Sequence, residues 1–511
     1  MGKRLILLLT AVIIITLPLG GCGTDLNGAV SGPAPVSGSE SGSGQEEVTS
    51  HSLTLPYDAK DSLDPFTCKT LANTSLIPVL YDGLFRINEK FEAEPVIAQE
   101  ITQSGTSFTV TLRSGVVFSD GSPVTGADIV YSWEKARTAE RYRDQLANIA
   151  SASVPREAAN TVVFQLIEPD PLFQNLLTFP IVKKDSKTEP PIGSGRYTAI
   201  LEANSAKLVY NQKHFRGATP EQLEIPLKSM PDDEAILSGI KTGTMSAVFS
   251  DLSSGELSSA GALSTPVPLN NMVYIGINSS RAFLLDPAVR QAISCAIDRG
   301  TVFFKGFSGT GSQASVPMHP LLAAQMDLTE VEQPAYDLTK ANSLLDGAGY
   351  QEKNAQGYRL INGEPVTLEL LVNGDNAFKK LAGSQIREML AAAGIQVTVT
   401  EASFADYEAA VKAGSYDLYI GEMKLLNNMS LDVLLKDSAY LAGARSETLL
   451  AAYRSYRDGS GEYADFIRAF NEEMPFVPLL FRSGILIYNR NIKTDVKVSV
   501  TDIYYNLEEW R

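Results

Sequence analysis

Apolar and polar positions divide the chain after residue 50 into short strands and helices. Residues 108–113 read Phe-Thr-Val-Thr-Leu-Arg, and this alternation predicts a strand with one buried face. Thr125 and Asp128 form an approximate capping box, which predicts the start of a helix. Asp286, followed by a proline, and Asp337 mark two further helix starts. Strands and helices are therefore mixed along one chain.

The most regular pattern lies between residues 366 and 420. It predicts, in order, a strand at 367–372, a helix at 378–393, a strand at 395–400, a helix from 403 to 414 and a strand at 416–420. Such a β-α-β-α-β unit requires a parallel sheet with helices on its faces. Ligands of these sheets bind beyond the carboxyl ends of the strands, so residues 421–425 are a candidate site. A strand-to-helix loop without function is the alternative.

The first 51 residues predict export and attachment to a membrane. Lys3 and Arg4 precede an apolar run at 5–19, which is shorter than the ~20 residues of a spanning helix and fits a signal peptide over 1–21. The segment Leu-Gly-Gly-Cys ending at Cys22 resembles the lipobox of bacterial lipoproteins, in which the cysteine sulfur is lipidated. An uncleaved anchor is the alternative. Residues 22–51 are rich in Gly, Ser and Pro, as a flexible tether is.

Composition narrows the class further. The chain has 511 residues, 44% of them hydrophobic, which fits two to four core-forming units and excludes disordered and multi-span membrane classes. Its 43 Lys and Arg against 59 Asp and Glu give a net charge of −16. This balance argues against nucleic acid as a partner.

Catalytic and metal-binding motifs are missing from the sequence. It contains no zinc-protease, P-loop, dinucleotide-binding, nucleophile-elbow or Cys-x-x-Cys pattern. Its three histidines, His51, His214 and His319, are dispersed and are expected to be structural. We therefore expect no enzyme, no cofactor and no metal site, although a carboxylate pair for glycoside hydrolysis remains open. Cys68 and Cys295 are expected to be free buried thiols, with one disulfide as the alternative.

Several segments together carry a family resemblance. They lie at 81–84, 108–125, 191–197, 211–217, 289–299, 341–350 and 416–418. In this order, over about residues 52 to 500, the chain resembles the family 5 solute-binding proteins, the peptide- and nickel-type receptors of ABC importers. The resemblance implies a two-lobed α/β fold of the type II periplasmic-binding-protein class, in its large peptide-binding form.

The resemblance also implies domain boundaries. Lobe I would comprise 52–268 and 484–511, with an extra subdomain at about 81–189, and lobe II would comprise 269–483. Two chain crossings would form the hinge. Residues 484–511 are strand-like and are expected to return to lobe I. A disulfide between the lobes would lock the hinge, which favours free thiols.

A receptor of this kind closes on a solute without changing it. The resemblance implies an oligopeptide ligand, with nickel chelates, oligosaccharides or a signal or pheromone role as alternatives. It implies an ABC permease and ATPase as partners and a monomer outside the cytoplasmic membrane, in a periplasm if an outer membrane exists.

The sequence departs from the family in one place. Peptide-binding relatives carry a Trp-Gly-Ala-Asp-like segment after the third strand, but here Met423 stands at the tryptophan and Leu426 at the aspartate. Glu422 is a candidate substitute for that carboxylate, and a solvent-facing Glu422 is the alternative. The residues expected to face the ligand are Asn73, Tyr274, Asn278, Glu422 and Lys424.

Overall fold

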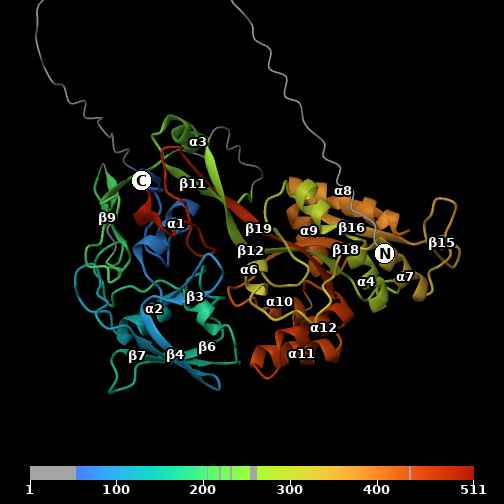
Figure 1. Ribbon diagram of the computed structural model, residues 1–511, viewed down its shortest axis with the longest axis horizontal. Coiled ribbons are helices and arrows are strands. Elements are labelled where there is room, and N and C mark those ends of the chain that lie inside the picture. The colour runs from blue at the N-terminus through green and yellow to red at the C-terminus, as the bar shows by residue number, and fades with distance from the viewer. Residues whose placement is uncertain (1–52, 204, 218–219, 231–232, 254–261, 437–438) are drawn as a thin grey trace, which may run out of the picture. The chain divides into compact units, whose positions relative to one another are not determined.

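The computed structural model describes residues 53–203, 205–217, 220–230, 233–253, 262–436 and 439–511 (Figure 1). The predicted signal peptide, Cys22, the tether and His51 lie outside the described residues. Within the described part, no helix combines the length and the apolar character that crossing a membrane requires.

Helices and strands are mixed along the described chain. The helices are α1 (Leu71–Leu80), α2 (Gly126–Ala136), α3 (Asp233–Thr242), α4 (Pro287–Ala296), α5 (Arg299–Thr301), α6 (Pro320–Ala323), α7 (Leu338–Gly347), α8 (Ala377–Ala392), α9 (Phe404–Lys412), α10 (Asp432–Leu435), α11 (Glu447–Asp458) and α12 (Tyr463–Glu473), with shorter helical turns at Phe173–Leu176, Val302–Gly306 and Leu507–Glu509. The strands are β1 (Leu55–Pro56), β2 (Phe85–Ile87), β3 (Ala93–Pro95), β4 (Ala98–Ser104), β5 (Ser107–Leu112), β6 (Ile149–Ser153), β7 (Thr161–Leu166), β8 (Tyr197–Leu201), β9 (Ala206–Tyr210), β10 (Glu224–Lys228), β11 (Ala247–Ser250), β12 (Leu263–Ile277), β13 (Ser312–Gln313), β14 (Leu360–Ile361), β15 (Glu364–Pro365), β16 (Thr367–Asn373), β17 (Gln396–Ala402), β18 (Leu418–Lys424) and β19 (Phe476–Tyr488).

The largest sheet confirms the predicted β-α-β-α-β unit. Its order is β11-β19-β12-β18-β16-β17, and β16 pairs in parallel with both β17 and β18. The predicted end of the third strand at residue 420 was wrong, because β18 continues to Lys424. Residues 418–424 pair antiparallel with 271–277 of β12, and this neighbour extends the strand through most of the predicted loop.

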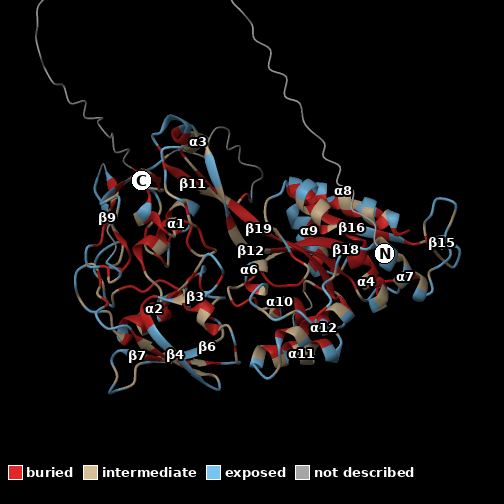
Figure 2. Cartoon of the chain, in the orientation of Figure 1, coloured by how far each residue is buried: buried red, intermediate tan, exposed pale blue. Residues whose placement is uncertain are grey.

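β12 and β19 are two long antiparallel strands that lie side by side (Figure 1). Both are almost entirely buried where they pair over 272–277 and 476–481 (Figure 2). The prediction of strand-like structure over 484–511 was only partly right. β19 begins at Phe476 and ends at Tyr488, and residues 489–511 contain a single helical turn at Leu507–Glu509 and no strand.

Separate hydrophobic cores organise the described residues. The largest core draws on residues 272–481, together with Ile87 and Phe91. A second core draws on 53–81, 182–267 and 486–510, so the irregular C-terminal segment packs against the start of the described chain. A third core lies within 84–181. The lobe and subdomain boundaries given above stay predictions.

Several local predictions are confirmed. Alternate residues of β5 are buried, as its pattern requires. Asp128 accepts hydrogen bonds from the Thr125 backbone N–H (2.9 Å) and hydroxyl (2.6 Å) at the start of α2. Asp286 and Asp337 cap α4 and α7 through their side chains. The two described cysteines are free and buried.

Candidate functional site

A cavity of about 260 Å³ lies where β12, β18 and β19 meet elements of the second core. Its walls come from α1, the loop after β11, the three strands, the loop after α2 and the C-terminal segment. The lining residues are Leu71, Thr74, Ser75, Pro78, Arg141, Phe249, Asp251, Ser253, Val267, Leu269, Asn271, Glu422, Lys424, Arg482, Val500, Thr501 and Ile503. The cavity is thus built from parts of the chain that lie as far apart in sequence as Leu71 and Ile503.

A break in strand pairing opens the floor of the cavity. Pro268 pairs with Ser483 and Met272 with Phe481, so three residues of β12 stand opposite the single residue Arg482 of β19. Such a bulge bends its strand and re-aims side chains. Two of the three bulged residues, Leu269 and Asn271, line the cavity together with Arg482.

Glu422 is a carboxylate that lines the cavity beside the bulge. Its Oε1 accepts hydrogen bonds from Asn271 Nδ2 (2.9 Å) and Arg482 Nη1 (3.1 Å), and its Oε2 lies 3.0 Å from Lys379 Nζ. Burial alone would raise the pKa of Glu422, but the two cations and the amide lower it below its ordinary value. Glu422 is therefore ionised and both of its oxygens are already bound.

Arg482 ties the floor to the loop after β11. Its Nη2 donates to the carbonyl oxygens of Asp251 (3.1 Å) and Leu252 (2.7 Å), while its Nη1 holds Glu422. The side chain is only 5% exposed, and its guanidinium nitrogens bind protein oxygens. Arg482 accordingly acts as a structural bridge within the site.

Lys424 and Arg141 are the cavity's remaining cations. Lys424 has an exposed side chain, yet the surrounding protein still removes enough water to lower its pKa, and Arg141 lowers it further while Asp251 opposes the shift. Among the described residues, neither Lys424 nor Arg141 forms an ion pair with a carboxylate.

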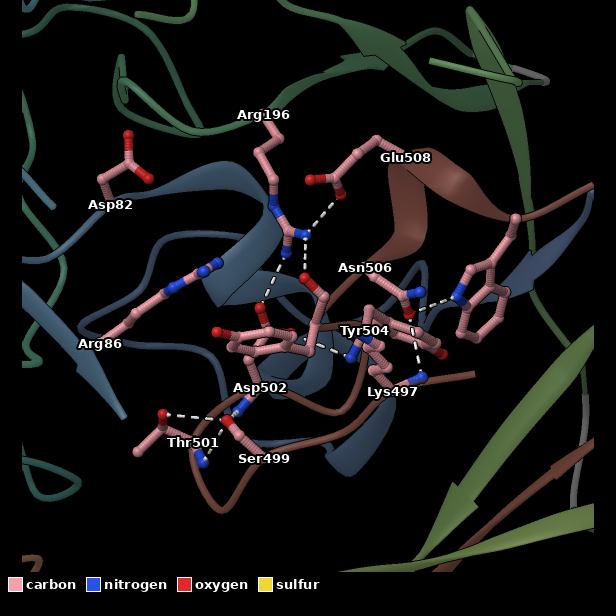
Figure 3. A network of polar contacts seen from close by, with 12 residues as sticks. Asp82, Arg86, Arg196, Lys497, Ser499, Thr501, Asp502, Tyr504, Asn506 and Glu508 are labelled. Carbon is pink, nitrogen blue, oxygen red and sulfur yellow. Dashed lines mark hydrogen bonds and ion pairs between the residues drawn. The ribbon is translucent and has the colours of Figure 1, made fainter. Parts of the chain in front are cut away.

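A buried ion network holds the C-terminal wall in place (Figure 3). Val500, Thr501 and Ile503 line the cavity, and Asp502 between them points away from it to Arg196 Nη2 at 2.8 Å. Arg196 Nη1 also donates to Glu508 Oε2 and to the Tyr505 carbonyl oxygen, both at 2.7 Å. One guanidinium therefore fixes the segment that supplies a cavity wall.

The structure brings together two of the five expected site residues. Glu422 and Lys424 line the cavity, and their contact with a ligand stays a prediction. The other three are buried and do not line it. Asn73 donates to the carbonyl oxygens of Asp58, Asp61 and Ser62. Asn278 donates to those of Gly414 and Tyr416.

Strand register explains the position of Tyr274. In the pairing of β12 with β18, Tyr274 stands opposite Gly421, and Gly276 stands opposite Tyr419. A Cβ on Gly421 would lie 2.4 Å from the Tyr274 ring, so the glycine makes room for it, as Gly276 does for Tyr419. The two hydroxyls are 2.8 Å apart. Because side chains alternate along a strand, Tyr274 lies on the face opposite to Glu422 and Lys424.

Sequence reasoning missed three charged residues of the cavity, Arg141, Asp251 and Arg482. None belongs to a motif, and each lies more than 50 residues in sequence from the nearest of the other two. The sequence pattern predicts a strand around Arg482 and a strand end before Asp251. It does not predict that these two side chains and Arg141 line the same cavity.

Two other cavities help to define the site. One of about 190 Å³ shares Leu71, Ser75, Phe249, Asp251 and Ser253 with the first, so the two cavities adjoin. Another of about 250 Å³ lies beside α4 and α12 and is lined only by residues 291–474. In the part of the chain that the structure describes, no group of His, Cys, Asp and Glu is arranged to hold a metal ion.

Comparison with known proteins identifies the family to which this chain belongs. The sequence profile of the bacterial extracellular solute-binding proteins, family 5, matches residues 92–427. The chain belongs to this family. It therefore has the family's two-lobed α/β fold and is a binding protein of transporters, not an enzyme.

Individual relatives span most of the chain. The oligopeptide-binding protein AppA of Bacillus subtilis is 23% identical over 478 residues, which cover 86% of this chain and 87% of that protein. The glutathione-binding protein GsiB of Salmonella typhi is 26% identical over 377 residues, with coverages of 69% and 68%. The crystal structure of a nickel ABC transporter protein from Bacillus halodurans superposes with a TM-score of 0.72 at 17% identity, covering 88% of this chain and 97% of that one.

Proposed function

We propose that this protein captures oligopeptides outside the cytoplasmic membrane and delivers them to an ABC permease. The observation that carries the proposal is the cavity at the β12–β19 bulge, which is bordered by the strands that join the largest core to the second core. A solute bound there contacts elements of both cores, which is what stabilising a closed form requires.

The dimensions of the site support a short ligand. At about 260 Å³, with a neighbouring space of about 190 Å³, it is comparable to ordinary small-molecule sites of about 300 to 1,000 Å³. The two spaces share lining residues at the start of α1 and in the loop after β11, and a peptide that occupies both would be recognised through main-chain hydrogen bonds. The peptide- and glutathione-binding relatives support the same ligand class.

Native mass spectrometry of the protein as purified tests the ligand class. We expect bound species that form a ladder of peptide masses, disappear after unfolding and refolding, and return when a peptide mixture is added. A single sugar or a metal chelate in place of the ladder would contradict the peptide assignment and leave a solute receptor. A refolded protein that retains no solute from any mixture would contradict solute capture itself.

We further propose that Cys22 carries a lipid that anchors the protein. The lipobox-like segment before it and the Gly/Ser-rich residues after it support this proposal. Cys22→Ala should release the protein from the membrane fraction into the medium or periplasm, whereas Cys68→Ala should leave it in the membrane fraction. Unchanged membrane retention of the Cys22 variant would contradict the anchor.

A further inference from the structure

The loop after β18 contacts two hydrophobic cores. It spans residues 425–431, and its Leu425 and Met429 belong to the largest core. Leu426 packs instead against the third core, which lies within 84–181. One short loop therefore contributes apolar side chains to both cores.

A buried ion pair lies at this contact. Asp170, whose side chain is fully buried, accepts a hydrogen bond from Asn428 Nδ2 at 2.6 Å and lies 3.2 Å from Arg457 Nη2. Arg457 is in the last turn of α11, and its side chain is 12% exposed. Burial alone would lower the pKa of Arg457, but Asp170 helps to raise it above its ordinary value. Each of the two charges requires the other, because a buried charge without a partner is strongly unfavourable.

Asparagine side chains extend the contact to the bulge of β12. Asn175 Nδ2 donates to the Asn427 carbonyl oxygen at 3.2 Å, and Asn270 Nδ2 donates to Asn427 Oδ1 at 2.7 Å. Asn270 lies between Leu269 and Asn271, the two bulge residues that line the cavity. The loop thus contacts both the third core's chain segment and the strand that shapes the cavity.

One oxygen of this cluster lacks a partner. Asn270 Oδ1 is buried, and no donor within the described part of the chain forms a hydrogen bond with it. An unpaired buried acceptor costs free energy, so the other bonds of the contact must offset this cost. Separation of the two cores would let water reach the oxygen. Opening is therefore favoured at this atom, while the buried ion pair opposes it.

We propose that these contacts form a latch that holds the largest core against the third core without any solute. β12 and β19 join the largest core to the second core through the chain itself, whereas residues 170–178 and 425–431 meet only through non-covalent contacts. Such contacts can open while the paired strands stay intact. The inference goes beyond solute capture and requires no particular class of ligand.

Neutralising both buried charges together tests the latch. Asp170→Asn/Arg457→Gln leaves neither charge unpaired, so the variant should fold, and circular dichroism would verify this. The full chain would be unfolded and refolded to remove solute. We expect backbone amides at 170–178 and 425–436 to exchange with deuterium about tenfold faster or more, and small-angle X-ray scattering to give a larger radius of gyration. Amides of β5 and β16, which lie within the third and the largest core, should keep their rates.

Two further variants make the test specific. Glu408→Gln/Lys412→Gln is the matched control, because it also removes one ion pair, here an exposed pair on α9. It should change neither the exchange rates nor the radius of gyration. Asn427→Ala removes the bond to Asn270 from a half-buried position and carries the test if the double variant does not fold. It should accelerate exchange in the same two segments.

The outcomes separate a latch from a local structural role. Unchanged exchange and an unchanged radius of gyration in the folded double variant would overturn the latch, since apolar contacts such as those of Leu426 would then hold the cores together. Faster exchange in the two segments with an unchanged radius would also overturn it, because the ion pair would then order only the loop. If neither variant folds, the contact is part of the fold and not a latch that opens. None of these results bears on solute capture, which native mass spectrometry tests separately.

Discussion

The Arg196 network offers a direct test of how the cavity wall at 500–503 is held. Arg196 and Asp502 are each only 7% exposed in their side chains and lie 2.8 Å apart, with Glu508 at 2.7 Å from the same guanidinium (Figure 3). Replacing Arg196 by Met keeps an unbranched apolar stem and removes the guanidinium with its charge. Asp502 is then left buried without its partner.

Arg196→Met should lower the free energy of unfolding considerably, because it leaves the buried Asp502 carboxylate without its cation. Breaking a buried pair from one side costs about 3 to 5 kcal/mol, whereas removing an exposed partner costs less than about 1 kcal/mol. Asp502→Asn in the Arg196→Met background should recover part of the loss, because the stranded charge is gone. A double-mutant cycle of the two changes should give a coupling energy of about 2 kcal/mol.

The two tryptophans of the chain make the measurement specific. Trp510 is fully buried, and its Nε1 donates to Asn506 Oδ1 at 3.0 Å within the same C-terminal segment. With Trp133 replaced by Phe, fluorescence during urea unfolding reports the release of this segment alone. Arg143→Met, whose side chain is 62% exposed, is the control and should change the midpoint little.

A loss below about 1 kcal/mol for Arg196→Met, or no coupling with Asp502, would refute this reasoning. It would mean that hydrophobic packing of the second core, rather than the ion network, holds the C-terminal segment. Peptide affinity gives a second readout, because Val500, Thr501 and Ile503 line the cavity. If Arg196→Met releases this segment, the variant should also bind peptide more weakly.

Local signals explain what could be predicted from the sequence. The β-α-β-α-β unit and the caps at Asp286 and Asp337 depend on residues within a few positions of one another, and the structure confirms them. The prediction of Glu422 and Lys424 rests on the rule that parallel strands place their carboxyl ends at one edge of a sheet. Both side chains line the cavity, although β18 runs four residues further than its own pattern indicates, and their contact with a ligand stays a prediction.

Pairing between distant segments explains what could not be predicted. The burial of Tyr274 depends on its register against Gly421, which lies 147 positions later in the chain. Arg141 and Arg482 reach the cavity because of a bulge between β12 and β19 and the packing of the loop after α2. The hydrophobic periodicity of a short sequence window does not predict strand register or the packing of distant loops, because both depend on contacts between segments far apart in the chain.

Two further predictions concern buried polar groups that join different parts of the chain. His319 packs on Phe91 and Phe481, and burial lowers its pKa from 6.5 to about 4. Because the unfolded chain then binds the proton more readily, stability should fall as the pH drops from about 6.5 to about 4. The loss is about 2 kcal/mol at pH 5 by urea unfolding and should be absent in His319→Phe; the same pH dependence in both proteins would contradict it. Asp170, whose side chain is fully buried, accepts from Asn428 Nδ2 at 2.6 Å and lies 3.2 Å from Arg457 Nη2. Asp170 thereby links residues 84–181, which contain the third core, to residues 272–481, which contain most of the largest core. Asp170→Asn leaves the guanidinium without a counter-charge and should lower the free energy of unfolding by about 3 kcal/mol. Asp144→Asn, with a side chain that is 77% exposed, should change it by less than about 0.5 kcal/mol. Equal effects of the two substitutions would mean that apolar contacts such as those of Phe91, and not the buried charge pair, hold these parts together.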